Sequence, residues 1–171
     1  MAITDFQPIP GKPNIRDRSA FGPNPVREKV LFVEDQFIEG ADLNEGFSIQ
    51  DRKRKAVGDM VARDGDRQKG GEAVVDIDGN TVTVTDGSIY IRGDVRPIAA
   101  AVLSAVPMTG DVVIGVRLTE TTVSAADDAT LYGLHPGGDS EGEPTAERMV
   151  TTLAWGFSGD GGSGFLYAVY L

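Results

Sequence analysis

The residue types that most often carry out chemistry are scarce in this chain. His135 is the only histidine, and it lies in the glycine-containing segment Leu134-His135-Pro136-Gly137-Gly138. A catalytic dyad would need a serine or a carboxylate brought to it by folding, and no nucleophile-elbow motif is present. The chain has no cysteine, which excludes disulfides, thiolate catalysis and cysteine-ligated metals. We therefore expect His135 to be exposed and the chain to have no catalytic residue.

Two acidic segments resemble pieces of calcium loops. They are Asp76-x-Asp78-Gly79-Asn80 and Asp64-Gly65-Asp66, and neither has the full series of oxygen donors that ends in a bidentate Glu. Both lie where hairpin turns are expected, and turns favour Asp and Gly for backbone reasons. The glycine-rich residues 159–164 lack the Lys-Ser/Thr pair of a phosphate loop. These patterns predict no metal and no cofactor.

Composition and charge exclude further classes. The 171 residues are 40% hydrophobic, with 22 glycines and 9 prolines among short apolar runs, which is typical of a turn-rich β protein. No run is long enough to span a membrane, and the N-terminus has no signal-peptide core, so we expect folding in the cytosol. The net charge of −10 arises from residues 71–171, because residues 1–70 are balanced. An acidic C-terminal part makes nucleic-acid binding unfavourable.

One long segment, residues 42–63, reads as an α-helix. Asp42 is the expected N-cap, and Glu45 can reach back to complete a capping box. Two apolar lines at helical spacing predict contact with more than one neighbour, including another subunit. The polar residues Gln50 and Arg54 interrupt the first line. The first line is Leu43, Phe47, Val57 and Val61; the second is Ile49, Ala56 and Met60.

The same helix carries the basic run Arg52-Lys53-Arg54-Lys55. Its simplest interpretation is a solvated helix face. The alternative is an ion-paired contact with an acidic neighbour, which the charge asymmetry of the chain favours.

Residues 1–28 predict an extended N-terminal arm. Five prolines in this segment forbid a regular helix and favour an extended path, and large apolar residues are interleaved with them. A purely disordered tail seldom carries that many apolar side chains. The arm either docks on another protein, straps its own domain or remains a flexible leader. Its apolar residues are Ile3, Phe6, Ile9, Ile15 and Phe21.

The remaining chain, residues 29–171, predicts one β-rich domain built as an antiparallel meander or sandwich. Residues 29–34 read as a buried strand, and Pro97 is expected to break the strand that precedes it. Residues 73–92 predict two consecutive hairpins with Asp-Gly turns. Residues 98–106 favour a strand over a short helix, and residues 112–119 predict a further strand. The long acidic segment 124–147 predicts a loop that is functional or contacts a partner. Residues 149–157 and 165–171 predict a final hairpin whose last strand is paired, cut from a longer protein or completed by a partner.

The order of several short motifs resembles a family of tailed-bacteriophage structural proteins associated with tail fibres and the baseplate. Residues 41–45 resemble the family's ELNELQ-type helix start, although Gly46-Phe47 stands where the family has Leu-Gln. Residues 87–96 resemble its G-x-I-Y-x-x-G-x-V-R segment. The similarity covers roughly residues 29–171 and also includes the motifs at residues 57–60, 64–66, 114–121, 127–128, 144–148 and 162–167.

This resemblance implies a structural virion protein without catalytic residues, made in the host cytoplasm and located in the virion tail. Its partners would be other tail or baseplate proteins and copies of itself, with a trimer as the usual state of fibres. The alternative is a host-glycan-binding or depolymerase module of the tail, although no carboxylate pair stands out by its spacing. The expected interface residues are Phe6, Ile9, Phe21, Leu43, Phe47, Arg54, Val57 and Met60.

Overall fold

The computed structural model describes residues 27–170, and the predicted arm residues Phe6, Ile9 and Phe21 lie outside this range. Within it, one α-helix and nine strands in three antiparallel sheets confirm a mainly β fold with one long helix. The elements are α1 (Gly40–Gly58), β1 (Arg67–Gly70), β2 (Ala73–Asp76), β3 (Thr81–Val84), β4 (Gly87–Ile91), β5 (Asp94–Ile98), β6 (Ala101–Ser104), β7 (Ile114–Val123), the 3-10 turn η3 (Ala129–Leu131), β8 (Arg148–Phe157) and β9 (Leu166–Tyr170).

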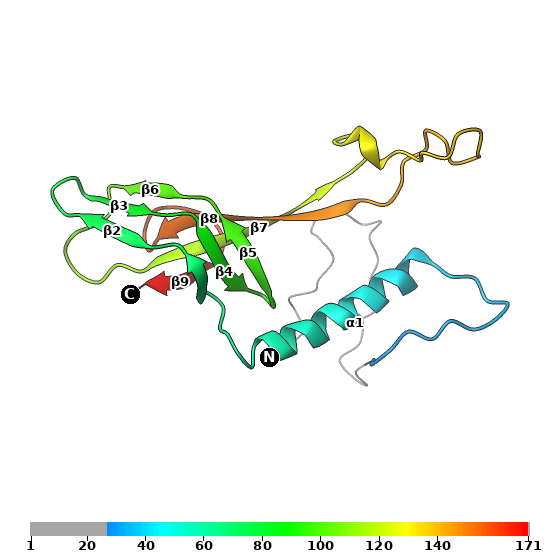
Figure 1. Cartoon of the computed structure of the whole chain (residues 1–171), viewed down its shortest axis with the longest axis horizontal. Helices are drawn as coiled ribbons and strands as arrows, with labels where there is room; N and C mark the ends of the chain where they lie inside the picture. The colour runs from blue at the N-terminus through cyan, green and yellow to red at the C-terminus, as the bar shows by residue number, and fades with distance from the viewer. Residues whose placement is uncertain (1–26, 171) are drawn as a thin grey trace.

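The three sheets form one body, from which two projections extend (Figure 1). One projection is the long ribbon of β7 and β8, whose far end carries the acidic residues 124–147. The other is α1, preceded by residues 27–39. The sheets have the strand orders β1-β4-β5, β2-β3-β6 and β8-β7-β9.

The first predicted hairpin is confirmed, but the second is wrong. β3 pairs with β2 on one side, as predicted, but with β6 on the other side. β4 does not pair with β3; it pairs with β1 and β5. A tight hairpin needs positive φ, and among the described residues neither Asp86 nor Gly87 has it. The tight turn is at Arg92 and Gly93, with φ of 52° and 85°, and it joins β4 to β5.

The predicted final hairpin is also wrong, because β8 and β9 lie on opposite sides of β7. Ile114 of β7 pairs with Phe157 on one side and with Tyr170 on the other. The expected break at Pro97 does not occur either. Pro97 is the partner of Ser88 within β5, an edge strand of its sheet, where a residue without an N–H is tolerated.

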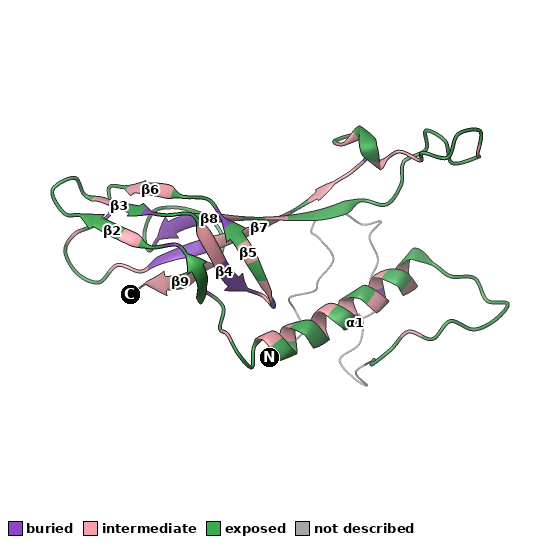
Figure 2. Cartoon of the chain, in the orientation of Figure 1, coloured by how far each residue is buried: buried purple, intermediate pink, exposed green. Residues whose placement is uncertain are grey.

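A single apolar core joins the three sheets. Its buried members are β-branched or aromatic, which suits a pleated surface. The buried residues gather in the body, whereas the far half of the β7–β8 ribbon and α1 consist mainly of intermediate and exposed residues (Figure 2). The core consists of Val82, Val84, Ile89, Ile91, Ile98, Val106, Ile114, Val116, Trp155 and Phe157.

The helix differs from its prediction at both ends. Its N-cap is Glu39, and Asp42 is the third helical residue, whose carboxylate accepts a hydrogen bond from the Glu39 N–H at 3.0 Å. The helix ends at Gly58 rather than at residue 63. The expected buried strand at residues 29–34 is wrong as well: these residues form no strand, and Leu31 is 72% exposed. In the described chain no strand forms backbone hydrogen bonds with these residues, so the apolar run remains exposed to solvent.

The connection between β8 and β9 is fixed by an ion pair at the base of the ribbon. Both terminal nitrogens of Arg117 lie 2.7 Å from the carboxylate oxygens of Asp160. Asp160 also accepts the N–H groups of Phe157 and Gly162, at 3.0 and 2.8 Å. These hydrogen bonds, first of all those from Arg117, lower the pKa of Asp160 to about 2 from an ordinary 3.8.

This lowered pKa predicts a specific acid sensitivity. The folded state holds the charged carboxylate more tightly than the unfolded chain, so the stabilisation is full above about pH 4 and is lost as the pH falls towards about 2. We expect the free energy of unfolding to lose about 2 kcal/mol over this range through Asp160 alone. Urea unfolding at several pH values should show a smaller pH dependence for Asp160→Asn than for the wild type. Asp111→Asn, at an exposed carboxylate, should retain the wild-type dependence.

Candidate functional site

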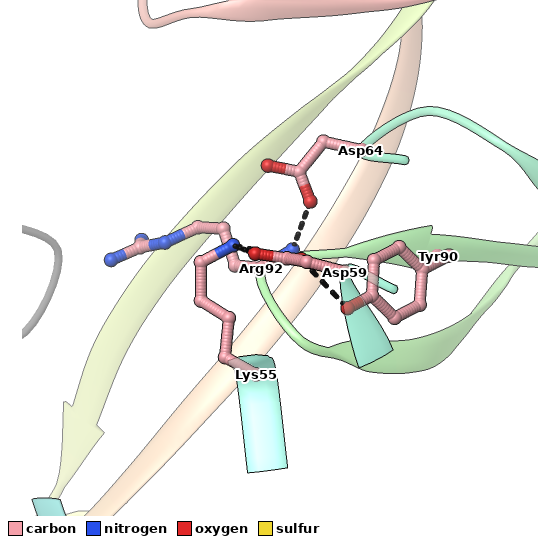
Figure 3. A network of polar contacts seen from close by, with 5 residues as sticks. All are labelled: Lys55, Asp59, Asp64, Tyr90 and Arg92. Carbon is pink, nitrogen blue, oxygen red and sulfur yellow. Dashed lines mark hydrogen bonds and ion pairs between the residues drawn. The ribbon is translucent and has the colours of Figure 1, made fainter. Parts of the chain in front are cut away.

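The end of α1 meets β4 in a compact polar network (Figure 3). The Tyr90 hydroxyl donates to the Asp59 carboxylate at 2.9 Å, and Lys55 Nζ donates to the same carboxylate at 2.9 and 3.1 Å. Beside them, the Arg92 N–H donates to Asp64 at 2.6 Å. We call these five residues the helix–sheet junction. It joins the last turn of α1 to the β4–β5 hairpin.

Glycines allow the close approach in this junction. A side chain at Gly58 would collide with the Tyr90 ring and hydroxyl, and one at Gly93 would lie within 3 Å of Lys55. The backbone adds two hydrogen bonds, from Gly65 N–H to Tyr90 O at 2.9 Å and from Tyr90 N–H to Asp66 O at 2.8 Å. The helix end can therefore lie directly on the sheet only where these glycines stand.

The charges of the junction suit a structural joint. Burial, followed by the hydrogen bond to Asp59, raises the pKa of Tyr90 to about 12, so its hydroxyl remains a donor at neutral pH. Burial acts to raise the pKa of Asp59, but the hydrogen bonds from Lys55 and Tyr90 outweigh it and leave that pKa lowered. At neutral pH Tyr90 therefore keeps its proton and donates a hydrogen bond to an ionised Asp59. Tyr90 is only 4% exposed, whereas the Asp59 side chain is 41% exposed, so the buried hydroxyl is held under a carboxylate that reaches the surface.

The start of the described chain lies along the opposite part of α1. The Arg27 guanidinium donates to the carboxylate of Glu45, which is only 6% exposed, at 2.9 Å. Arg52 donates to the Arg27 carbonyl at 2.6 Å and Lys53 to the Glu28 carbonyl at 3.0 Å. We call residues 27–30 the strap. Lys53 also forms an ion pair with Glu28 at 3.2 Å. Part of the basic run is therefore paired with an acidic residue of the same chain.

The expected interface residues Leu43, Phe47 and Val57 lie on the exposed side of α1, whereas Met60 lies in the turn that follows the helix. Arg54 also lies on that side of α1, with its side chain 59% exposed and 3.2 Å from Asp51. The second apolar line is divided, because Ile49 is 1% exposed while Met60 remains open. The exposed fractions are 47% for Leu43, 70% for Phe47, 66% for Val57, 86% for Val61 and 83% for Met60.

The candidate catalytic and binding motifs come together nowhere in the described chain. His135 lies exposed in the loop at the end of the ribbon. The Asp76 carboxylate accepts the Gly79 N–H at 3.1 Å, so this acidic segment is a side-chain-stabilised turn. Residues 27–170 contain no group of three acidic, histidine or cysteine side chains able to hold a metal. No helix of that part of the chain is long and apolar enough to cross a membrane.

The aromatic residues that could bind a sugar are mostly used within the fold. Trp155 is 8% exposed, and its indole N–H donates to the Ala99 carbonyl at 3.1 Å. The Tyr170 hydroxyl donates to the Gly71 carbonyl at 2.6 Å. Together with the buried Tyr90, these residues form no exposed platform for stacking. Each of these side chains is held inside the body or at its edge.

The geometry defines a class of protein: a β-rich body that carries an anchored helix with an exposed apolar side. A family model described as a domain of unknown function (DUF4815) matches residues 14–171, so the chain belongs to that family. A search among curated proteins and a search among solved structures found no match. The description of the family assigns no activity, so any function must be argued from the surface of this chain.

The junction predicts a local effect of removing one hydroxyl. Tyr90→Phe should leave the Asp59 carboxylate with Lys55 alone, and the free energy of unfolding should fall by about 1 kcal/mol. Amide hydrogen exchange should rise at residues 55–66 and remain unchanged in β7 and β8. Tyr170→Phe, which also removes a hydrogen-bonded hydroxyl, should leave exchange in residues 55–66 unchanged. Equal exchange of residues 55–66 in Tyr90→Phe and wild type would refute the anchoring role.

Proposed function

We propose that this chain is a structural virion protein of a tailed bacteriophage, an assembly component of the tail fibre or baseplate. The observation that carries the proposal is the exposed apolar side of α1, on a helix that the junction and the strap hold in place. Ten of the 19 exposed large apolar side chains in the described chain lie between Leu31 and Val61, three of them in α1 and the others in the segments on either side of it. An apolar surface of this extent on a soluble protein marks an interaction site.

The ordering of α1 supports this proposal further. Binding costs less free energy when the contact surface is already fixed, since fewer side chains and backbone segments must be ordered. The strap contacts through Arg27 and Glu28 and the junction through Tyr90 and Asp59 hold the helix at both sides. The motif order in residues 29–171 that resembles tail-fibre and baseplate proteins supports the virion context.

The competing proposal of a glycan-binding or depolymerase module has less support. It would need exposed aromatic rings or a pair of carboxylates around a cleft. In the described chain Trp155 and Tyr90 are buried, and the exposed rings of Phe47 and Phe165 belong to different parts of the chain, α1 and the connection before β9. The carboxylates of Asp160 and Asp59 are engaged in hydrogen bonds that hold the β8–β9 connection and the end of α1. Release of reducing sugars from host capsule polysaccharide by the purified chain would favour this alternative.

Particle composition tests the proposed function directly. Mass spectrometry of purified virions that encode the chain should find it in the tail fraction, and gold-labelled antibodies should mark the tail. A chain that is abundant in the infected cell but missing from purified particles would contradict the proposal.

The residues before the strap should be needed for incorporation. We expect a chain that lacks residues 1–26 but retains Arg27 and Glu28 to keep the wild-type circular dichroism and melting temperature, because the strap contacts remain. Its incorporation into particles should fall at least about tenfold if the arm docks on a neighbour, since a lost contact of about 1.4 kcal/mol already has that effect. If the shortened chain melts much earlier or precipitates, the arm belongs to the chain's own core instead.

A further inference from the structure

The exposed side of α1 has the spacing of a coiled-coil seam. Its positions Leu43, Phe47, Gln50, Arg54 and Val57 are separated alternately by four and three residues, and Val61 follows at the same spacing in the turn after α1. Such alternation keeps one narrow stripe facing a partner helix, with each side chain entering a gap between side chains of the other helix. The whole stripe is exposed, whereas Glu45 and Ile49 on another side of α1 are buried. The described part of the chain therefore leaves the seam without an occupant.

We propose that the seam packs antiparallel against the same seam of a second copy of this chain, about a two-fold axis near Arg52. This inference deepens the assembly role proposed above by naming a second copy as one partner, and it rests on that role and on the geometry of α1. The axis places Phe47 opposite Val57 of the second copy, both within α1, and Leu43 opposite Val61, which lies in the turn that follows α1. Apolar residues thus meet apolar residues at both ends of the contact. The two polar positions, Gln50 and Arg54, meet each other at its centre.

Charge favours the antiparallel direction. Parallel helices in register would place Arg54 against Arg54 of the second copy, with Lys53 flanking both, and like charges at a helix contact repel. Antiparallel helices place Arg54 opposite Gln50, with Asp51 of the second copy adjacent. Arg54 already lies 3.2 Å from Asp51 of its own chain. In the dimer, Arg54 of each copy can therefore pair with Asp51 of the other copy, and no unpaired charge is buried.

The seam is short, and anchoring offsets this weakness. α1 has 19 residues, and helices of this length are marginal when isolated. Here the helix is already ordered by the strap and by the junction, so association does not have to fold it. Within α1 the seam runs about 21 Å from Leu43 to Val57, which gives room for several layers of side chains.

A charge placed in the seam tests the contact. We expect light scattering to find the wild-type chain as a dimer at micromolar concentration and Phe47→Asp as a monomer. The dissociation constant of the dimer should be at least about tenfold larger for the variant. Phe165→Asp is the matched control, because Phe165 lies outside α1 and is 72% exposed against 70% for Phe47. It should remain a dimer. A monomeric wild type, or equal dissociation of both variants, would overturn the proposal, and circular dichroism checks that each variant folds.

The absence of cysteine from the sequence allows the direction of the helices to be read by cross-linking. Leu43→Cys and Val61→Cys are produced singly and co-expressed with different tags, then oxidised. The antiparallel contact should give a disulfide-linked dimer that carries both tags, and neither variant should cross-link when produced alone. Cross-linking of each variant with itself would indicate a parallel or three-fold contact and overturn the proposed register.

The outcome separates this inference from the proposed function. A dimer with the expected cross-link that never enters virions would support the seam and contradict the virion role. A monomer found in purified tails would contradict the seam and leave the virion role supported.

Discussion

The structure depends on how a helix with little to bury is held against a β body. Only Glu45 and Ile49 of α1 are buried, so apolar packing cannot fix its position. Its place is set by directed contacts instead: the Tyr90 and Lys55 hydrogen bonds to Asp59, and the clamp of Arg52 and Lys53 on the strap. These contacts depend on orientation, and because of them α1 projects from the body with its apolar side open.

Anchoring by polar contacts and exposure of an apolar seam belong together. If α1 were held by its apolar side, as in an ordinary globular domain, that side would be covered and unavailable to a partner. Because the strap and the junction take up the polar side, the stripe from Leu43 to Val61 remains exposed. The same separation is found in the β7–β8 ribbon, whose base contributes Val116 and Trp155 to the core while its far end is exposed.

Local signals in the sequence predicted the elements well and their partners poorly. Thr/Val alternation predicted β3 correctly, and its pairing with β2 followed from the short turn between them. The predicted second hairpin, between β3 and β4, was wrong because a turn motif does not reveal the φ angles of Asp86 and Gly87. The last two strands were assigned to one hairpin because they are neighbours in the chain, whereas β7 pairs with both. Strand partners far apart in sequence are decided by packing, which no local pattern contains.

The sequence by itself determined a β-rich chain with one amphipathic helix, no cysteine chemistry and an apolar stripe interrupted by Gln50 and Arg54. These properties follow from residue types and periodicity, which are local. Only the tertiary structure decided that the stripe faces solvent, that Lys29 to Glu34 form no buried strand, and that Gly58 and Gly93 mark the contact between helix and sheet. The physical reason is that burial is a property of two surfaces, and a sequence pattern describes only one of them.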